Sequence, residues 1–204
     1  MAGASKPETS PMPGGRLPRL LLHCCCAPCA SYVFEYLSSS YSITAFYYNP
    51  NITPRDEYYK RAGEFQKLPD PTGRGEGIDA VVCDYNPEPF IEAASPYSGE
   101  PEGGARCRIC IGLRLSETAK YARQNGFQCF TTTLSVSRHK NADMIGGLGK
   151  DSEEEHGVPY LHGDFKKNDG YRRSVELSKQ YGLYRQKYCG CIFSKGGDAD
   201  NQHS

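Results

Sequence analysis

The sequence has no long apolar run. None of its stretches approaches the length needed to cross a membrane, and the apolar run at residues 20–22 is too short for the core of a signal peptide. The residues before that run are rich in Pro, Gly and Ser and offer little apolar surface to offset the entropy of ordering. We therefore expect residues 1–18 to form a disordered leader, and the protein to be cytoplasmic without a membrane partner.

The sequence also lacks net charge, internal repeats and a nucleotide-binding signature. Its 24 Lys and Arg balance its 24 Asp and Glu, so overall charge neither requires nor excludes a nucleic-acid partner. No glycine-rich loop follows the first apolar run, which argues against a nucleotide site of the usual kinds. The length of 204 residues fits one domain, which we place at residues 19–195, before a flexible tail at 196–204.

Short apolar runs alternate with helical patterns along the chain. We expect strands at residues 20–22, 43–48, 78–83, 127–133 and 158–161. A helix candidate follows each run, the clearest being one capped by Thr53, one at about 106–125 and one at about 170–181. Residues 96–104 are predicted to form a surface loop and residues 146–149 a helix exit. This alternation predicts a single-domain α/β fold, a mostly parallel, doubly wound sheet with helices on both faces.

Ten cysteines are many for a chain of this length. Eight of them fall in three motifs: HCCCAPC at residues 23–29, Cys107-x-x-Cys110, and Cys189-Gly190-Cys191. The first motif directly follows the first predicted strand, where the loops of an open α/β sheet form its reactive crevice. In a reducing compartment such thiols favour metal binding or redox chemistry over structural disulfides.

The motifs hold more cysteines than one metal centre needs. A single zinc or iron–sulfur centre takes about four ligands, whereas the motifs supply four, two and two cysteines. Either there are two metal centres, or one metal centre lies beside a redox-active dithiol. Cys189 and Cys191 suit the dithiol role, because a disulfide between them would be strained and strained disulfides are easily reduced. Zinc stays open as a structural alternative. Cys83 and Cys129 lie within predicted strands and are expected to be inert.

Four segments give the sequence a resemblance to a known family. They are LLLHCCCAPC at residues 20–29, Cys107-x-x-Cys110, TTTLSVSRHKN at 131–141 and DFKKNDGYRRSVELSKQYGLYRQKYCGC at 164–191. Through these segments the chain resembles the epoxyqueuosine reductase QueH family over residues 19–194. The resemblance implies a reductase that converts epoxyqueuosine to queuosine at the tRNA wobble position, the last step of queuosine biosynthesis, by two-electron removal of the epoxide oxygen. Its partners would be tRNA bearing epoxyqueuosine and an electron donor that the sequence does not identify.

The resemblance also implies a cofactor. In the family, four cysteines of the first two motifs hold a four-iron, four-sulfur (4Fe-4S) cluster. By motif, these ligands are Cys25, Cys26, Cys107 and Cys110. The family's redox-active disulfide corresponds to Cys189 and Cys191. Position 29 is Cys here and often Asp in relatives, an alternation that suits a metal ligand. We therefore hypothesise that Cys29 helps to hold a second, mononuclear iron, together with Cys189 or Cys191.

Opening an epoxide requires protonation of its oxygen or its binding by a Lewis acid. Three residues are candidates for the proton donor: Asp84 just past the third predicted strand, Asp164 just past the fifth, and Tyr188 beside the redox pair. The alternative is that the carboxylates are ordinary loop residues and the tyrosine is packed in the core. His23 is expected to orient the loop rather than to transfer protons.

A basic segment lies near the end of the domain. Residues 166–195 contain eight Lys or Arg and two acidic residues, a net charge of six positive. Four tyrosines are interleaved with them: Tyr171, Tyr181, Tyr184 and Tyr188. Basic side chains neutralise phosphates and aromatic rings stack on unpaired bases, so this composition suits RNA. Arg138, His139 and Lys140 extend the patch, and the alternative is a solvated helix face with core tyrosines.

Two other classes of protein fit parts of the pattern. One is a zinc-stabilised RNA-binding module without catalysis, and the other is a dithiol oxidoreductase that uses Cys189 and Cys191 without metal. Iron with acid-labile sulfide in the protein would favour the reductase. Zinc without sulfide would favour the binding module, and activity that survives chelation would favour the dithiol enzyme.

Overall fold

A computed structural model describes residues 15–69, 78–186 and 188–194. The predicted tail and most of the predicted leader lie outside these residues. Four strands form one sheet in the order β3-β2-β1-β4. They are β1 (Arg19–His23), β2 (Ser42–Tyr47), β3 (Asp79–Val82) and β4 (Cys129–Thr132). All three strand pairs are parallel, as the alternation of strands and helices predicted.

The central strand β1 explains why the sheet is buried on both faces. Leu20, Leu21 and Leu22 are fully buried, and such a continuous apolar run is typical of a parallel strand covered on both sides. β1 pairs with β2 on one side, where His23 lies opposite Phe46, and with β4 on the other, where it lies opposite Thr132.

The prediction of a fifth strand at residues 158–161 was wrong in the length of the strand. Only Tyr160 forms a bridge, to Phe130 of β4. The amide of Phe130 donates to the Pro159 carbonyl at 3.0 Å, and the amide of Leu161 donates to the Phe130 carbonyl at 2.9 Å. Pro159 has no N–H to add to the ladder, so the segment follows the sheet edge without becoming a full strand.

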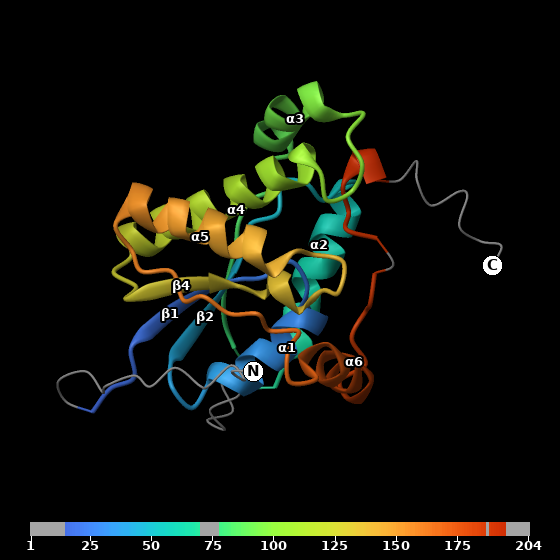
Figure 1. The fold of residues 1–204 in the computed structure, drawn as a ribbon. Helices are drawn as coiled ribbons and strands as arrows, with labels where there is room; N and C mark the ends of the chain where they lie inside the picture. The colour runs from blue at the N-terminus through green and yellow to red at the C-terminus, as the bar shows by residue number, and fades with distance from the viewer. Residues whose placement is uncertain (1–14, 70–77, 187, 195–204) are drawn as a thin grey trace.

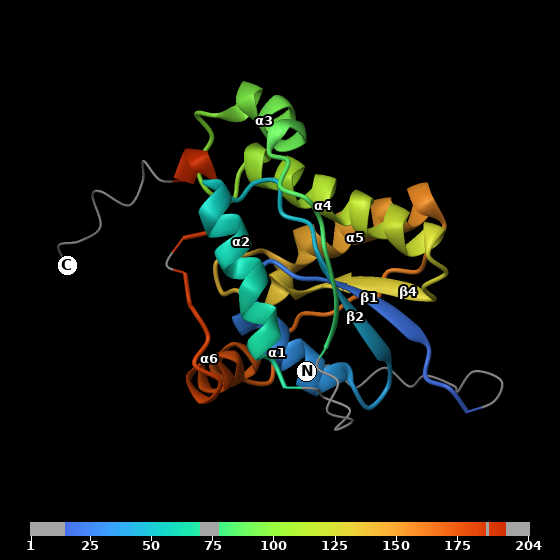
Figure 2. The same cartoon turned by 180° about the vertical axis from the view of Figure 1, so that it is seen from behind.

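Helices cover both faces of the sheet (Figures 1 and 2). The α-helices are α1 (Ala27–Leu37), α2 (Arg55–Gly63), α3 (Glu88–Ala94), α4 (Ala105–Gln124), α5 (Ala142–His156) and α6 (Gly170–Gln180). Short 3₁₀ turns are η1 (Glu64–Lys67), η2 (Ser95–Tyr97), η3 (Thr133–Val136) and η4 (Ile192–Ser194). One core cluster joins the sheet to α1, α2 and α6, and a second joins it to α4 and α5. None of the helices in the described ranges is long and apolar enough to span a membrane.

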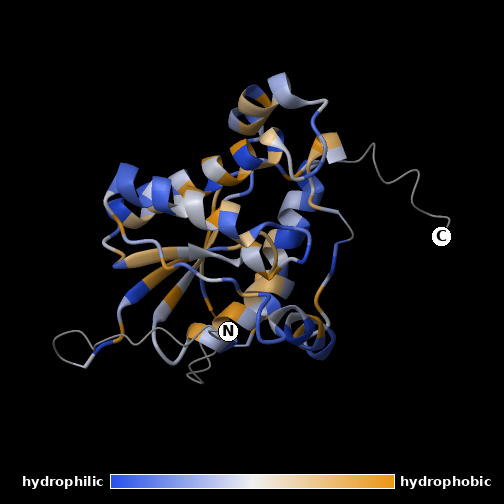
Figure 3. Ribbon diagram, viewed as in Figure 1, coloured by the Kyte–Doolittle hydropathy of each residue, from blue (hydrophilic) through white to orange (hydrophobic). Residues whose placement is uncertain are grey.

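Hydropathy follows these layers. Figure 3 shows hydrophobic residues along the strands and α1, and hydrophilic residues on the outer helices α5 and α6. The predicted surface loop at 96–104 is largely exposed, although its start belongs to η2.

Two local predictions about helix ends were wrong. Thr53 does not cap α2: Pro54 is the N-cap residue, without a side-chain hydrogen bond, and the Thr53 amide donates instead to the Gly190 carbonyl at 3.0 Å. Residues 146–149 do not end a helix but lie inside α5. A Cβ at Gly149 would overlap the Tyr160 ring, so glycine lets α5 approach the segment that borders β4.

The strand order locates the reactive crevice. The chain moves from β1 outward through β2 to β3 and then returns to place β4 on the other side of β1. Ligand sites of open α/β sheets form at such a switch point, outside the carboxyl ends of the strands. The HCCCAPC segment leaves β1 at this point, next to the turn that leaves β4.

Candidate functional site

Three thiols of the HCCCAPC segment lie together at the switch point. Cys26 is the N-cap of α1 and has an extended backbone, and Pro28 occupies the first helical turn. The Sγ atoms of Cys25, Cys26 and Cys29 all lie within 4.8 Å of one another, and those of Cys25 and Cys26 are 3.9 Å apart. A single ion could contact all three sulfurs.

The three thiols cannot all ionise without a counter-charge. The neighbouring thiols of Cys26 and Cys29 hold the pKa of Cys25 well below its usual range, although burial opposes this. Cys25 in turn raises the pKa of Cys26 to about 12, and Cys25 and Cys26 raise the pKa of Cys29. Without a metal, ionisation of Cys25 alone is therefore favoured. A bound metal cation would also favour ionisation of Cys26 and Cys29. The donor set fits a metal that prefers sulfur, such as zinc or iron.

Cys24 does not belong to this group. Its side chain is fully buried in the core on the α1 side of the sheet, and its Sγ donates to the Leu22 carbonyl at 3.2 Å. Burial raises the pKa of the Cys24 thiol well above its usual value. The residue is thus suited to packing rather than to chemistry.

A second group of thiols lies in a small apolar cluster. Cys110 of α4 packs there with Cys189 and Cys191 and with Phe90 of α3. The neighbouring Cys191 thiol lowers the pKa of Cys189 to about 5, and the pKa of Cys191 is raised. All three cysteines are free thiols in this structure. The two cysteines of the Cys-Gly-Cys motif thus lie together with Cys110 in one cluster.

Cys107 lies on the first turn of α4, half-buried. Its Sγ accepts a hydrogen bond from the Gly103 amide at 3.3 Å. Among the described residues, the group with three sulfurs in mutual reach comprises Cys25, Cys26 and Cys29, and it does not include Cys107 or Cys110. The structure therefore brings together two of the four predicted cluster ligands with Cys29, and places Cys110 beside Cys189 and Cys191 instead.

A buried arginine links the first two cysteine motifs. Arg114 of α4 is 4 % exposed, and its Nε donates to the Cys110 carbonyl at 3.0 Å. Its Nη1 donates to Asn49 Oδ1 at 3.4 Å, and Asn49 Nδ2 donates to the Cys24 carbonyl at 2.9 Å. No carboxylate among the described residues pairs with Arg114 within 4.0 Å. Burial raises the pKa of Cys110, and the charge of Arg114 opposes that rise and also favours the thiolate of Cys25.

His23 anchors the carboxyl end of β1. Its ring is fully buried, with Nδ1 2.8 Å from Thr132 Oγ1 and Nε2 3.2 Å from the Tyr48 carbonyl oxygen. Burial, helped by the charge of Arg114, lowers its pKa to about 4. A neutral ring held at both nitrogens agrees with the predicted role in orienting the loop.

A second buried arginine holds the Cys-Gly-Cys segment. Arg61 of α2 is 2 % exposed, and its Nε donates to Glu57 Oε1 at 2.7 Å. Its Nη1 donates to the Cys189 carbonyl at 3.2 Å and its Nη2 to the Tyr188 carbonyl at 3.3 Å. The Arg61 Cζ also lies 5.2 Å from the centroid of the Tyr188 ring. Together with the bond from Thr53 to Gly190, these contacts fix the segment against α2.

Of the three predicted proton donors, Tyr188 adjoins the Cys-Gly-Cys motif, since it precedes Cys189 and its carbonyl accepts a hydrogen bond from Arg61. Asp84 is exposed beyond β3, at the far edge of the sheet. Asp164 lies 3.8 Å from Lys166 Nζ and 3.9 Å from Lys167 Nζ, and it lines a pocket whose walls contain no cysteine.

Sequence reasoning missed Arg61, Asn49 and Arg114. Asn49 had a usable signal, because it is a polar residue just past the carboxyl end of a predicted strand. The two arginines lie on helices that carry many charges, and nothing local marks them as buried.

Known proteins are similar to this chain over most of its length. A family model described as "Epoxyqueuosine reductase QueH" matches residues 20–196. A curated protein of that name from Streptococcus pyogenes serotype M1 is 42% identical over 87% of this chain and 70% of its own length. Namesakes from Staphylococcus epidermidis and Staphylococcus aureus are 39% and 38% identical, over 88% and 87% of this chain and 77% and 75% of their own lengths. The chain belongs to the epoxyqueuosine reductase QueH family.

Proposed function

We propose that this protein is an oxidoreductase that reduces epoxyqueuosine to queuosine in tRNA, the last step of queuosine biosynthesis. The single observation that carries the proposal is the group of three thiols at the switch point, in a chain whose curated relatives are named epoxyqueuosine reductases. The reaction consumes two electrons and two protons, and the epoxide oxygen leaves as water while the carbon–carbon double bond forms. The electrons come from a donor still to be identified. The expected place of action is the cytoplasm.

The proposed cofactor is a 4Fe-4S cluster held by Cys25, Cys26, Cys107 and Cys110, with Cys29 on a second iron. All-sulfur donors and the unpaired guanidinium of Arg114 support an anionic, thiolate-held centre. The contact of Cys29 with Cys25 and Cys26 supports its place among the ligands. When bound, such a centre supplies electrons, and an iron beside it acts as a Lewis acid for the epoxide oxygen.

The protein's own residues then have separate tasks. Cys189 and Cys191 lie beside Cys110, which supports a two-electron dithiol relay between the external donor and the metal centre. Formation of their disulfide would release two electrons and two protons, matching the demand of the reaction. Among the three candidate proton donors, Tyr188 is favoured because it directly precedes Cys189. The ion pairs of Asp164 and the exposure of Asp84 favour the alternative that both are ordinary loop carboxylates.

The test is conversion of the substrate nucleoside. Protein purified without oxygen is incubated with a reductant and with tRNA that carries epoxyqueuosine, and the tRNA is digested for nucleoside analysis. Queuosine should appear with the wild type and with Cys129→Ser, a change of a half-buried thiol at the start of β4, but not with Cys25→Ser. Zinc without sulfide in the purified protein, and no queuosine, would instead support a zinc-stabilised RNA-binding module.

A further inference from the structure

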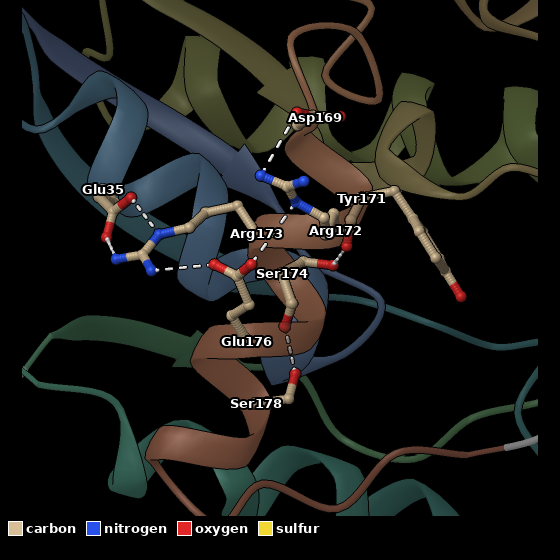
Figure 4. A network of polar contacts seen from close by, with 8 residues as sticks. All are labelled: Glu35, Asp169, Tyr171, Arg172, Arg173, Ser174, Glu176 and Ser178. Atoms are coloured by element: carbon tan, nitrogen blue, oxygen red, sulfur yellow. Dashed lines mark hydrogen bonds and ion pairs between the residues drawn. The ribbon is translucent and has the colours of Figure 1, made fainter.

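The basic segment near the C-terminus has two unlike faces. Four of its cations are neutralised by four carboxylates, and Figure 4 shows two of these cations, Arg172 and Arg173, with Glu35, Asp169 and Glu176. Arg173 Nη2 lies 2.8 Å from Glu35 Oε2 and its Nη1 3.3 Å from Glu176 Oε2, and Arg172 pairs with Asp169 and Glu176 at 3.5 Å each. Lys166 and Lys167 pair with Asp164. Lys187 and Lys195 lie outside the described residues. These four cations are therefore not free to bind phosphate, although they contribute to the net positive charge counted along the sequence.

Two cations from outside α6 meet Tyr171 of this helix and lack such partners within the described ranges. Figure 4 shows that Tyr171 points away from the side where Arg173 meets Glu35. The Cζ of Arg138 lies 4.1 Å from the centroid of the Tyr171 ring, and the Cζ of Arg185 lies 5.9 Å from it. Both arginines are exposed, and neither pairs with a carboxylate of the described chain within 4.0 Å. Three chain segments thus bring two guanidinium groups that have no carboxylate partner among the described residues to one tyrosine.

This cluster borders the first cysteine motif. Arg138 follows the turn η3, whose Thr133 Oγ1 accepts a hydrogen bond from the Cys25 amide at 3.5 Å and lies 3.9 Å from Cys25 Sγ. The Lys140 carbonyl accepts a hydrogen bond from Lys166 Nζ at 3.0 Å, which fastens the 137–141 loop to the segment before α6. Arg185 Nη1 donates to Ser178 Oγ at 3.1 Å and is likewise held in place. The cluster is therefore a fixed rim beside the thiols and not a set of independent side chains.

The chemistry of this rim suits single-stranded RNA. Guanidinium groups bind phosphate oxygens with two donors each, and a tyrosine ring stacks on an unpaired base. We propose that Arg138, Tyr171 and Arg185 form the surface that holds the anticodon-loop strand next to the reacting nucleoside. The proposal rests on the proposed function, because it takes the wobble nucleoside to be the group that enters the site.

The test compares the two faces of α6 in the full chain. Binding of tRNA that carries epoxyqueuosine is measured by fluorescence anisotropy at several salt concentrations for Arg138→Gln, Arg185→Gln and the double variant. Arg172→Gln is the matched control, since it also removes one arginine of this region but from the paired face. Each arginine on the rim should account for about one released counterion, so the slope of log Kd against log salt should fall by about one per substitution. Affinity near 0.15 M salt should fall about five- to tenfold per substitution.

Tyr171→Leu separates stacking from charge. It should weaken binding about tenfold while leaving the salt slope unchanged, because it removes a stacking platform but no positive charge. Circular dichroism and metal content of each variant report whether the fold is kept.

The proposal is overturned if the double variant keeps wild-type affinity and slope, or if Arg172→Gln lowers both as much as the rim variants do. Failure of the proposed function would look different: the wild type would make no queuosine at saturating tRNA. If the wild type makes queuosine and the rim variants bind normally, only the surface is wrong.

Discussion

Arg61 of α2 and Cys189 are 128 positions apart in the sequence, yet Arg61 Nη1 donates a 3.2 Å hydrogen bond to the Cys189 carbonyl. The same guanidinium is paired with Glu57 and nearly fully buried. The proposed redox pair, Cys189 and Cys191, is therefore held from outside its own segment, by an arginine whose charge is balanced by a carboxylate on the arginine's own helix.

Arg61→Met should destabilise the fold and displace the thiol pair. It leaves Glu57, whose side chain is 11% exposed, without its cation, and breaking a buried ion pair costs about 3–5 kcal/mol. Urea unfolding measures this loss, and stopped-flow oxidation of the dithiol measures the displacement. Lys120→Met is the control, because its pair with Glu117 is exposed and should contribute less than about 1 kcal/mol. Equal stabilities of the two variants would contradict the assignment.

Gly190→Ala should impair turnover at intact metal content. Gly190 has a φ of 97°, and a Cβ there would come within 2.9 Å of Ile52 Cγ1 and 3.3 Å of Arg61 Nη1. The left-handed backbone alone costs an L-residue about 1–2 kcal/mol, and the contacts push the segment away from α2. Gly182→Ala is a matched control, with a φ of 60° and open space around the new methyl group. Turnover in Gly190→Ala that equals that of the control would show that the close fit is unimportant.

Arg114→Gln should make the proposed metal centre harder to reduce. Reduction adds negative charge, and Arg114 is the buried cation that links Cys110 to the first motif. Its loss should shift the midpoint potential to more negative values, measured by a spectroscopic redox titration, and Arg114→Lys should recover part of the shift. Arg123→Gln removes an exposed charge in the last turn of α4 and should leave the potential alone. An unchanged potential in Arg114→Gln would exclude the charge-compensating role.

Acid should loosen the connection between η1 and the C-terminal segment. Burial acts to raise the pKa of Glu64, but hydrogen bonds from Lys67 and from the Tyr184 amide outweigh it, and the net pKa is lowered. Because the pKa of Glu64 is lower in the folded protein, its ionised carboxylate stabilises the fold. This stabilisation is complete above the pKa of the unfolded chain, near 4.5, and is lost as the pH falls through the pKa of the folded protein. Urea unfolding from pH 7 to pH 3 should show wild type more stable than Glu64→Gln at neutral pH, with the difference vanishing in acid. A difference that is constant with pH would refute this origin.

The sequence predicted the parts of the molecule whose signals are local. The apolar run at Leu20–Leu22 predicted a strand, which the structure shows to be buried and central, and the HCCCAPC motif indicated the place where three thiols meet. The fifth strand failed because one proline interrupts its ladder, and the glycines of α5 were mistaken for a helix end because the packing of Tyr160 that requires one of them is not visible in sequence.

The remaining features depend on distant contacts. Arg61 and Arg114 are ordinary helix residues until the fold brings them to Cys189 and Asn49. Likewise, the net charge of residues 166–195 suggested one basic patch, whereas Glu35 and Asp164, both outside that range, help to neutralise half of it. Such pairings are set by tertiary structure, so composition alone cannot reveal them.

The most direct test of the account is iron and acid-labile sulfide analysis of anaerobically purified protein, with electron paramagnetic resonance after reduction. We predict a brown protein with about four iron and four sulfide in its cluster, any further iron belonging to the second site. Iron should be lost in Cys25→Ser, reduced in Cys29→Ala and unchanged in Cys129→Ser. A colourless, iron-free protein that still converts epoxyqueuosine to queuosine would contradict the account.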